Sequence, residues 1–204
     1  MTAGPAYCTP VKKVRTRFTV QGSKFISTLA AVEDEETARL AISEIGREFP
    51  DASHHAFAYR IGCGSALVER ASDDREPAGT AGAPMLQVLQ GGNISDALVV
   101  ATRYFGGTKL GIGGLTRAYR ECARLCLAEA VLQKKEPLRE YILKLDYEDL
   151  GAVTKLLESL GASVASADYG AAVTMQILIP ARKGAVLKKK FQNACRGRGL
   201  ITGP

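Results

Sequence analysis

Residues 96–119 read DALVVATRYFGGTKLGIGGLTRAY, an apolar run, a turn rich in glycine and the start of a helical pattern. The apolar run, 96–105, is short and ends at turn residues, which is typical of a buried strand. From about Gly113 to Gln133 the apolar residues recur every three or four positions, as they do along one face of a helix. The stretch therefore predicts a strand, a glycine-rich turn and the start of a helix in direct succession.

The turn between this strand and helix has the chemistry of an anion-binding loop. The first amides of a helix have no partner within the helix and lie at the positive end of its dipole. Glycines let the backbone expose such amides, and lysine or arginine side chains add positive charge. The residues predicted to bind a phosphate-type anion or RNA are Arg103, Gly106, Gly107, Lys109, Gly111, Gly113, Gly114, Arg117, Arg120 and Arg124.

The spacing of these glycines matches neither GxxxxGK[ST] nor GxGxxG, the two common nucleotide-binding patterns. A tight loop whose glycines only permit turns is therefore the alternative interpretation. The sequence also contains no G-x-S-x-G or H-E-x-x-H motif. We predict no catalytic residue, no cofactor and no metal ligand.

A second stretch, DDREPAGTAGAP (73–84), crowds acids between glycines and prolines. Paired carboxylates can hold a hydrated Mg²⁺ or transfer protons. We favour the other interpretation, in which the acids cap turns and an arginine pairs with a nearby acid. The two adjacent histidines open a predicted strand, so they must point to opposite faces. If this stretch and the glycine loop line one cleft, its candidate residues are His54, His55, Asp73, Asp74, Arg75, Glu76 and Thr80.

Hydrophobic periodicity predicts two domains of the α+β class, 1–134 and 135–204. The expected elements of the first are a loose arm over the first dozen residues, hairpin strands 14–20 and 24–32, a helix 33–49, a strand 54–62, a turn-rich segment 63–84, a short helix 84–90, and the strand and helix described above. Those of the second are a strand 141–147, a helix 148–160, strands 163–169 and 171–180, a helix 182–195 and a strand 199–202. The second order is β-α-β-β-α-β, the ferredoxin-like unit.

Positive charge is unevenly distributed over the 204 residues and their net charge of +6. Lysine and arginine outnumber the acids by 16 to 14 in residues 1–134 and by 11 to 7 in 135–204. From Pro180 onward there is no acid, and the basic residues are Arg182, Lys183, Lys188, Lys189, Lys190, Arg196 and Arg198. Such a segment favours an anionic partner such as RNA, DNA or the ribosome, although a solvated basic helix without a partner explains it equally well.

The five cysteines are odd in number and lack C-x-x-C spacing, which indicates reduced thiols in a cytoplasm. Cys122 and Cys126 lie on one face of the predicted helix, where we expect small core residues rather than metal ligands. No stretch approaches the roughly 20 apolar residues of a membrane span, and the N-terminus has no apolar signal core. We expect a cytoplasmic protein without a membrane partner, and the sequence does not predict its oligomeric state.

Four blocks of the sequence together resemble the YigZ/IMPACT family. They are SKFI (23–26), HHAFAYRIG (54–62), DDREPAGTAGAPML (73–86) and VATRYFGGTKLGIGGLTRAY (100–119). The C-terminal segment resembles the smaller domain that bacterial YigZ-type members append. The resemblance implies an N-terminal domain like the second domain of ribosomal protein S5 and a ferredoxin-like C-terminal domain. The same pair of folds resembles the last two domains of elongation factor G.

Eukaryotic members of this family regulate translation through a further N-terminal domain that the present sequence does not contain, so their kinase-regulating role is not carried over. We expect a non-catalytic protein that binds RNA, the ribosome or translation factors, with regulation of translation as the implied role. One alternative is an enzyme that acts on a small phosphorylated or nucleotide-like substrate, by analogy of fold with small-molecule kinases. The other is a module that binds a partner protein.

Overall fold

The computed structural model describes residues 6–203, which form two compact units. The first unit, the N-terminal domain, spans 6–135, and the second, the C-terminal domain, begins at Glu136. The sequence placed the boundary between residues 134 and 135. Both domains combine helices with antiparallel sheets, which confirms the predicted α+β class.

The N-terminal domain is built on a five-stranded antiparallel sheet with the strand order β2-β3-β6-β4-β5. Its strands are β2 (Val14–Val20), β3 (Ser23–Ala31), β4 (His54–Ile61), β5 (Val68–Ser72) and β6 (Ala97–Tyr104). The central strand β6 is buried along all but its last residue, as the apolar run predicted. The predicted hairpin of β2 and β3 is also present, with a tight turn in which Gln21 and Gly22 have φ values of 46° and 81°.

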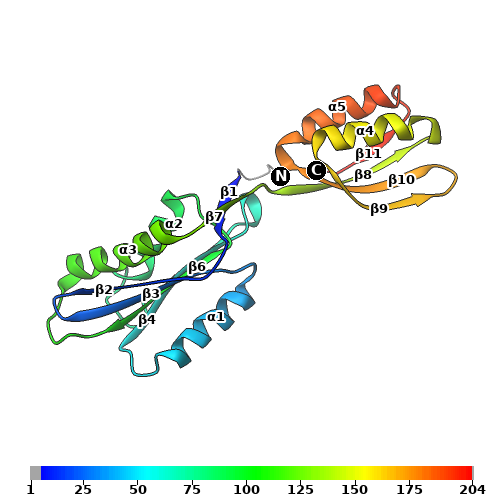
Figure 1. Cartoon of the computed structure of the whole chain (residues 1–204). Coiled ribbons are helices and arrows are strands. Elements are labelled where there is room, and N and C mark those ends of the chain that lie inside the picture. The colour runs from blue at the N-terminus through cyan, green and yellow to red at the C-terminus, as the bar shows by residue number, and fades with distance from the viewer. Residues whose placement is uncertain (1–5, 204) are drawn as a thin grey trace. The chain divides into compact units, whose positions relative to one another are not determined.

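Helices cover both faces of this sheet (Figure 1). The neighbouring helices α2 (Gly82–Gly91) and α3 (Gly111–Glu129) pack on one face, where they bury Val99 and Ala101 of β6. On the other face, α1 (Glu35–Glu48) packs against β4 and β6. Because side chains alternate along a strand, successive residues of β6 belong to two different cores.

A short ribbon joins the two ends of the N-terminal domain. It pairs β1 (Tyr7–Pro10) with β7 (Leu132–Lys135) in antiparallel register, so that Tyr7 lies opposite Lys135. Both residues donate to the Oδ2 atom of buried Asp96, the Tyr7 hydroxyl at 2.6 Å and the Lys135 Nζ at 2.9 Å. Asp96 thereby fixes the entry and the exit of the chain at one point.

Three predictions for this domain are wrong in detail. The expected loose arm is a strand over residues 7–10, while its first five residues lie outside the described ones. The long helix ends at Glu129 rather than near Gln133, because the chain there extends to pair with β1. The turn-rich segment contains the edge strand β5 as well as a short 3-10 helix, η1 (Gly64–Ala66).

The C-terminal domain confirms the predicted ferredoxin-like order. Its sheet has the strand order β11-β8-β10-β9 and is entirely antiparallel. The elements are β8 (Leu138–Leu145), η2 (Tyr147–Asp149), α4 (Leu150–Leu160), β9 (Ser163–Tyr169), β10 (Val173–Pro180), η3 (Ala181–Lys183), α5 (Gly184–Ala194) and β11 (Leu200–Thr202). Every second residue of β10, from Val173 to Ile179, is buried in a core shared with both helices. This alternation is the period-two pattern that predicted the strand.

The cysteines agree with the expectation of free thiols, since all five are unpaired. Cys122 and Cys126 are buried in the core between α3 and the sheet, and burial raises the pKa of Cys122 well above its ordinary value. Over residues 6–203, no helix combines the length and the apolar character needed to cross a membrane.

Candidate anion-binding site

The predicted anion-binding loop, residues 105–110, connects β6 to α3, and its glycines have different physical roles. Gly106 lies against the β2–β3 turn, where a Cβ atom would be 1.9 Å from the carbonyl carbon of Gly22, so no side chain fits. Gly107 and Gly111 have φ values of 86° and 68°, a left-handed backbone that glycine adopts without strain. The two remaining predicted glycines, Gly113 and Gly114, lie in the first turn of α3.

The start of α3 is open to a ligand. No side chain caps this helix end. The backbone amides of residues 107–110 donate to no acceptor in the described part of the chain, whereas those of Phe105 and Gly106 donate to the Ser53 and Ser23 hydroxyls at 3.2 and 3.3 Å. Unpaired amides beside an uncapped helix end are the arrangement that attracts an anion.

The glycine loop and the acidic stretch line one pocket of about 250 Å³. Glu76 and Pro77 form one wall, and the other consists of Arg103, Phe105, Leu115 and the segment Lys109–Ile112. Of the seven residues predicted to share such a cleft, only Glu76 lines this pocket. The Lys109 side chain is exposed and has no hydrogen-bond or ion-pair partner within residues 6–203.

Arg103, predicted to bind the anion, instead forms a buried ion pair with the pocket wall. Its Nη1 atom lies 2.6 Å from Glu76 Oε1, and both side chains are about 95% buried. The Tyr119 hydroxyl donates to the same carboxylate oxygen at 2.7 Å, and burial together with this bond raises the pKa of Tyr119. The guanidinium also lies over the rings of Phe25 and Phe105. Glu76 therefore already neutralises Arg103, and the charge available to an anion comes from Lys109 and the amides.

The other acids of the second stretch hold the backbone, as the structural interpretation proposed. Asp73 accepts hydrogen bonds from the amides of Gly79, Ala81 and Gly82 at 2.7 to 2.9 Å, and so caps the start of α2. Asp74 Oδ2 accepts from the His55 amide at 2.6 Å. Thr80 is also engaged locally, because its hydroxyl donates to the Pro77 carbonyl oxygen at 2.6 Å.

The two histidines point to different faces, as predicted. The His54 Nδ1 atom donates to the carbonyl oxygen of Asp74 at 2.8 Å, and its Nε2 lies 3.8 Å from Glu76 Oε1. His55 instead contacts the Thr102 hydroxyl, at 3.1 Å. Asp74 and Arg75 both have positive φ, 41° and 69°, so the loop is held in a backbone conformation that side chains disfavour.

The predicted arginines of α3 differ in what they contact. Arg124 pairs with Glu121 through two hydrogen bonds of 2.9 and 3.0 Å, and Arg120 donates to Gln87 at 2.9 Å. Arg117 has no such partner among the described residues, and it lines a groove of about 430 Å³ between α3 and the β2–β3 turn. Arg117 and Lys109 are thus the predicted cations of this region whose side chains have no hydrogen-bond or ion-pair partner among residues 6–203.

The basic segment of the C-terminal domain is largely engaged within its own domain. Arg182 pairs with Glu136 at 3.2 Å, Lys183 donates to the Leu160 carbonyl oxygen at 2.7 Å, and Lys188 lies over the Tyr141 ring. The exposed members for which the described residues provide no partner are Lys189, Lys190 and Arg196.

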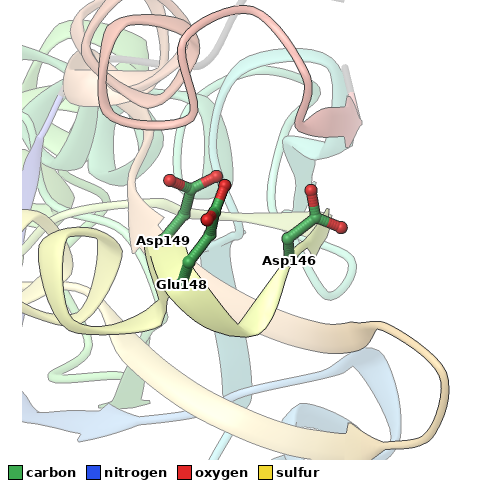
Figure 2. A group of neighbouring side chains, drawn as sticks. All are labelled: Asp146, Glu148 and Asp149. Carbon is green, nitrogen blue, oxygen red and sulfur yellow. The ribbon is translucent and has the colours of Figure 1, made fainter.

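Arg198 is held by a cluster of three carboxylates on the turn that leads into α4. Figure 2 shows Asp146, Glu148 and Asp149 on this turn, with one oxygen of each within 4.8 Å of the others. Arg198 pairs with Glu148, with Asp149 at 3.2 Å and with Asp146 at 3.9 Å. The guanidinium offsets one of the three negative charges, so the carboxylates and Arg198 stabilise each other.

One basic surface was missed from the sequence. Arg17 of β2 and Lys24 of β3 border a groove of about 590 Å³ on the sheet face that also carries α1. A signal for it was present, because the predicted alternation of the hairpin puts Arg15 and Arg17 on one face of β2.

Comparisons with known proteins agree with this architecture. The family model described as the Impact N-terminal domain matches residues 21–127, and a domain of unknown function (DUF1949) matches 143–198.

"IMPACT family member YigZ" of Escherichia coli is 36% identical over 87% of this chain and 88% of its own. A crystal structure titled as that of a hypothetical protein is 34% identical, with a TM-score of 0.68 over 98% of this chain and 97% of its own. "Protein IMPACT-B" of Xenopus tropicalis is 30% identical over 59% of this chain and 38% of its own. The chain therefore belongs to the IMPACT family, and it combines the Impact N-terminal domain with a ferredoxin-like C-terminal domain.

Proposed function

We propose that the protein is a non-catalytic RNA-binding protein of the translation machinery, which holds phosphate groups at the start of α3. The observation that carries this proposal is the combination of unpaired amides at residues 107–110 with the uncapped helix end and the exposed Lys109. Arg117 lies one to two turns further along α3 and extends the positive surface. Backbone amides and lysine are general phosphate ligands that carry no sequence preference.

A salt series tests this proposal directly. Fluorescence anisotropy of labelled tRNA and ribosomal RNA fragments gives the affinity between 50 and 300 mM KCl. Each neutralised phosphate contributes roughly 0.7 to 0.9 to the slope of log affinity against log salt. We expect the variant with both Lys109→Ala and Arg117→Ala to bind about tenfold more weakly at 100 mM KCl and to lose about 1.5 of the slope.

The matched control is Arg124→Ala, which removes a charge from the same helix. Because Glu121 already pairs with Arg124, this variant is expected to bind within about twofold of the parent protein. A flat salt profile, or equal losses in the double variant and the control, would contradict the proposal.

A second candidate function, an enzyme for a small phosphorylated substrate, is favoured by the lining of the pocket of about 250 Å³, which brings Glu76 and Lys109 together. Its general base or metal ligand would be Glu76, which the ion pair with Arg103 occupies. Thermal unfolding in the presence of nucleotides and sugar phosphates separates the two candidates. A stabilising small ligand supports the enzyme, and stabilisation by RNA alone supports the binding protein.

A further inference from the structure

The sheet of the N-terminal domain has a half-open face. Helix α1 packs against β4 and β6, and beyond it the same face of β2 and β3 borders the groove of about 590 Å³. The strand register places two neighbouring cross-strand rows beside the groove. Thr19 lies opposite Lys24, which in turn lies opposite Tyr104, and the next row brings Arg17 opposite Ile26.

Positive charge is in excess at this groove. Arg17 and Lys24 occupy diagonal positions on neighbouring strands, and neither side chain makes a hydrogen bond or ion pair with the described residues. Like charges at such positions repel each other. An anion between them relieves this repulsion.

The acids nearby are already engaged. Glu48 is bound by the Arg15 guanidinium and also lies within the electrostatic influence of Lys13 and Arg17. Asp51, the one carboxylate among the groove-lining residues, accepts a hydrogen bond of 2.9 Å from the Tyr104 hydroxyl. That bond fixes the Tyr104 ring at the edge of the groove beside Lys24.

Aromatic rings and cations together define the class of ligand. Phe49 and Tyr104 line the same groove as Arg17 and Lys24. Rings that stack bases, beside cations that hold phosphates, are the means by which proteins bind single-stranded nucleic acid. An acidic peptide uses the cations but has no use for the rings, and a duplex keeps its bases covered.

The groove shares two lining residues with the groove that contains Arg117. Phe18 and Thr19 line both this groove and the one that contains Arg117, and Tyr104 directly precedes the glycine loop. We propose that single-stranded RNA crosses the β2–β3 hairpin from the glycine loop to the open face, where Arg17 and Lys24 bind its phosphates and a base stacks on Tyr104. This inference rests on the proposed function, for which it specifies the form of the RNA and its path.

The test compares binding of a labelled 12-nucleotide uridine-rich RNA with binding of the same strand in a duplex. We expect Tyr104→Ala to weaken binding of the single strand about 5- to 150-fold, the usual range for loss of one base stack. Tyr104→Phe keeps the ring and is expected to stay within about threefold of the parent protein. The variant with both Arg17→Ala and Lys24→Ala is expected to lose about 1.4 of the salt slope.

The matched control is Arg39→Ala, because Arg39 belongs to α1 and faces Glu36 at 3.7 Å. Photocrosslinking with 4-thiouridine provides a readout that does not depend on affinity, with crosslinks expected on residues 17–26 and on Tyr104. Thermal unfolding of each variant shows that the domain is intact.

Four outcomes overturn the inference, and they differ in what they leave standing. If Lys109→Ala with Arg117→Ala weakens RNA binding while the groove variants do not, the proposed function survives and the path is wrong. Equal affinity for duplex and single strand likewise leaves the proposed function standing and shows that the path is wrong. Competition by polyglutamate as strong as that by RNA reassigns the groove to an acidic protein. Absence of RNA binding even at 50 mM KCl removes both proposals.

Discussion

In one of the two basic regions of this protein, fewer cations are free to bind a ligand than the sequence indicates, and in the other more are free. The segment from Arg182 to Arg198 has the denser charge, yet carboxylates, a carbonyl oxygen and an aromatic ring engage four of its seven cations. The glycine-loop end of the N-terminal domain has fewer cations, but Lys109, Arg117, Arg17 and Lys24 form no ion pairs with described residues. Charge density along a chain is thus a poor measure of charge that a ligand can use.

The reason for this difference is the distance along the chain between partners. Arg198 is paired with Asp149, and Arg182 with Glu136, across more than forty intervening residues in each case. A count of charges within one segment cannot include such acids. At the glycine loop, the nearest acid, Glu76, is already occupied by the buried Arg103, so it does not neutralise Lys109.

The largest expected effect separates Arg103 from the exposed cations. Glu76→Ala leaves the Arg103 guanidinium buried without a counter-charge, which typically costs about 3 to 5 kcal/mol of unfolding free energy. Urea unfolding followed by circular dichroism measures this loss. Lys109→Ala is the control and is expected to change stability by less than about 0.5 kcal/mol. A loss below about 1 kcal/mol for Glu76→Ala would show that Arg103 does not depend on this pair.

A smaller effect tests whether Arg198 is structural. Arg198→Ala leaves three neighbouring carboxylates without their cation, and we expect a modest fall in the urea midpoint of the C-terminal domain, because the arginine side chain is 44% exposed and solvent screens its ion pairs. Lys190→Ala, on the adjacent helix, is the control with no expected loss. If Arg198→Ala instead weakens RNA binding and leaves stability unchanged, the C-terminal segment is an RNA site after all.

The acid side of the pH profile tests the cap at α2. Burial by itself raises the pKa of Asp73, but the three backbone amides outweigh it and hold the pKa below its ordinary value. Stability from this carboxylate is therefore present above about pH 4 and lost as the pH falls through the lower folded-state pKa. Urea unfolding at pH 7, 5, 4 and 3 should show a shallower acid decline for Asp73→Asn, which starts about 1 kcal/mol lower at pH 7. Parallel profiles would contradict the cap.

The smallest effect is expected at the exposed lysines of α5. The variant with both Lys189→Ala and Lys190→Ala removes two cations without partners in the described chain, far from the glycine loop in sequence. We expect its RNA affinity at 100 mM KCl to fall by less than about threefold, because exposed lysines outside a bound contact add only a weak attraction that salt screens. A loss equal to that of the Lys109 and Arg117 variant would make the two regions equivalent partners.

Sequence patterns predicted most elements because their causes are local. The alternation in β10, the apolar run of β6 and the helical period of α3 are each visible within a dozen residues. The strand β1 was missed because its partner β7 lies more than a hundred residues away, and β5 was missed because it is an exposed edge strand.

The candidate site was only partly readable. The loop and its glycines follow from the sequence, whereas the loss of Arg103 to the core depends on the acid that folds beside it. The alternation of side chains along β6 did indicate that Arg103 would be buried. Val99, Ala101 and Arg103 point to the same side of β6, and the first two are core residues beneath α2 and α3. A cation in that row needs a buried counter-ion.

Because Tyr7 pairs with Lys135, the two ends of the N-terminal domain lie side by side, and the domain can be inserted into another chain as a unit. Its two ends are adjacent strands that Asp96 holds together, so insertion of this unit into a longer polypeptide requires no distortion at either junction. The Xenopus tropicalis relative, in which the similarity covers 38% of the chain, is consistent with such transfer. Grafting residues 6–135 into a surface loop of an unrelated host should accordingly leave both folds intact.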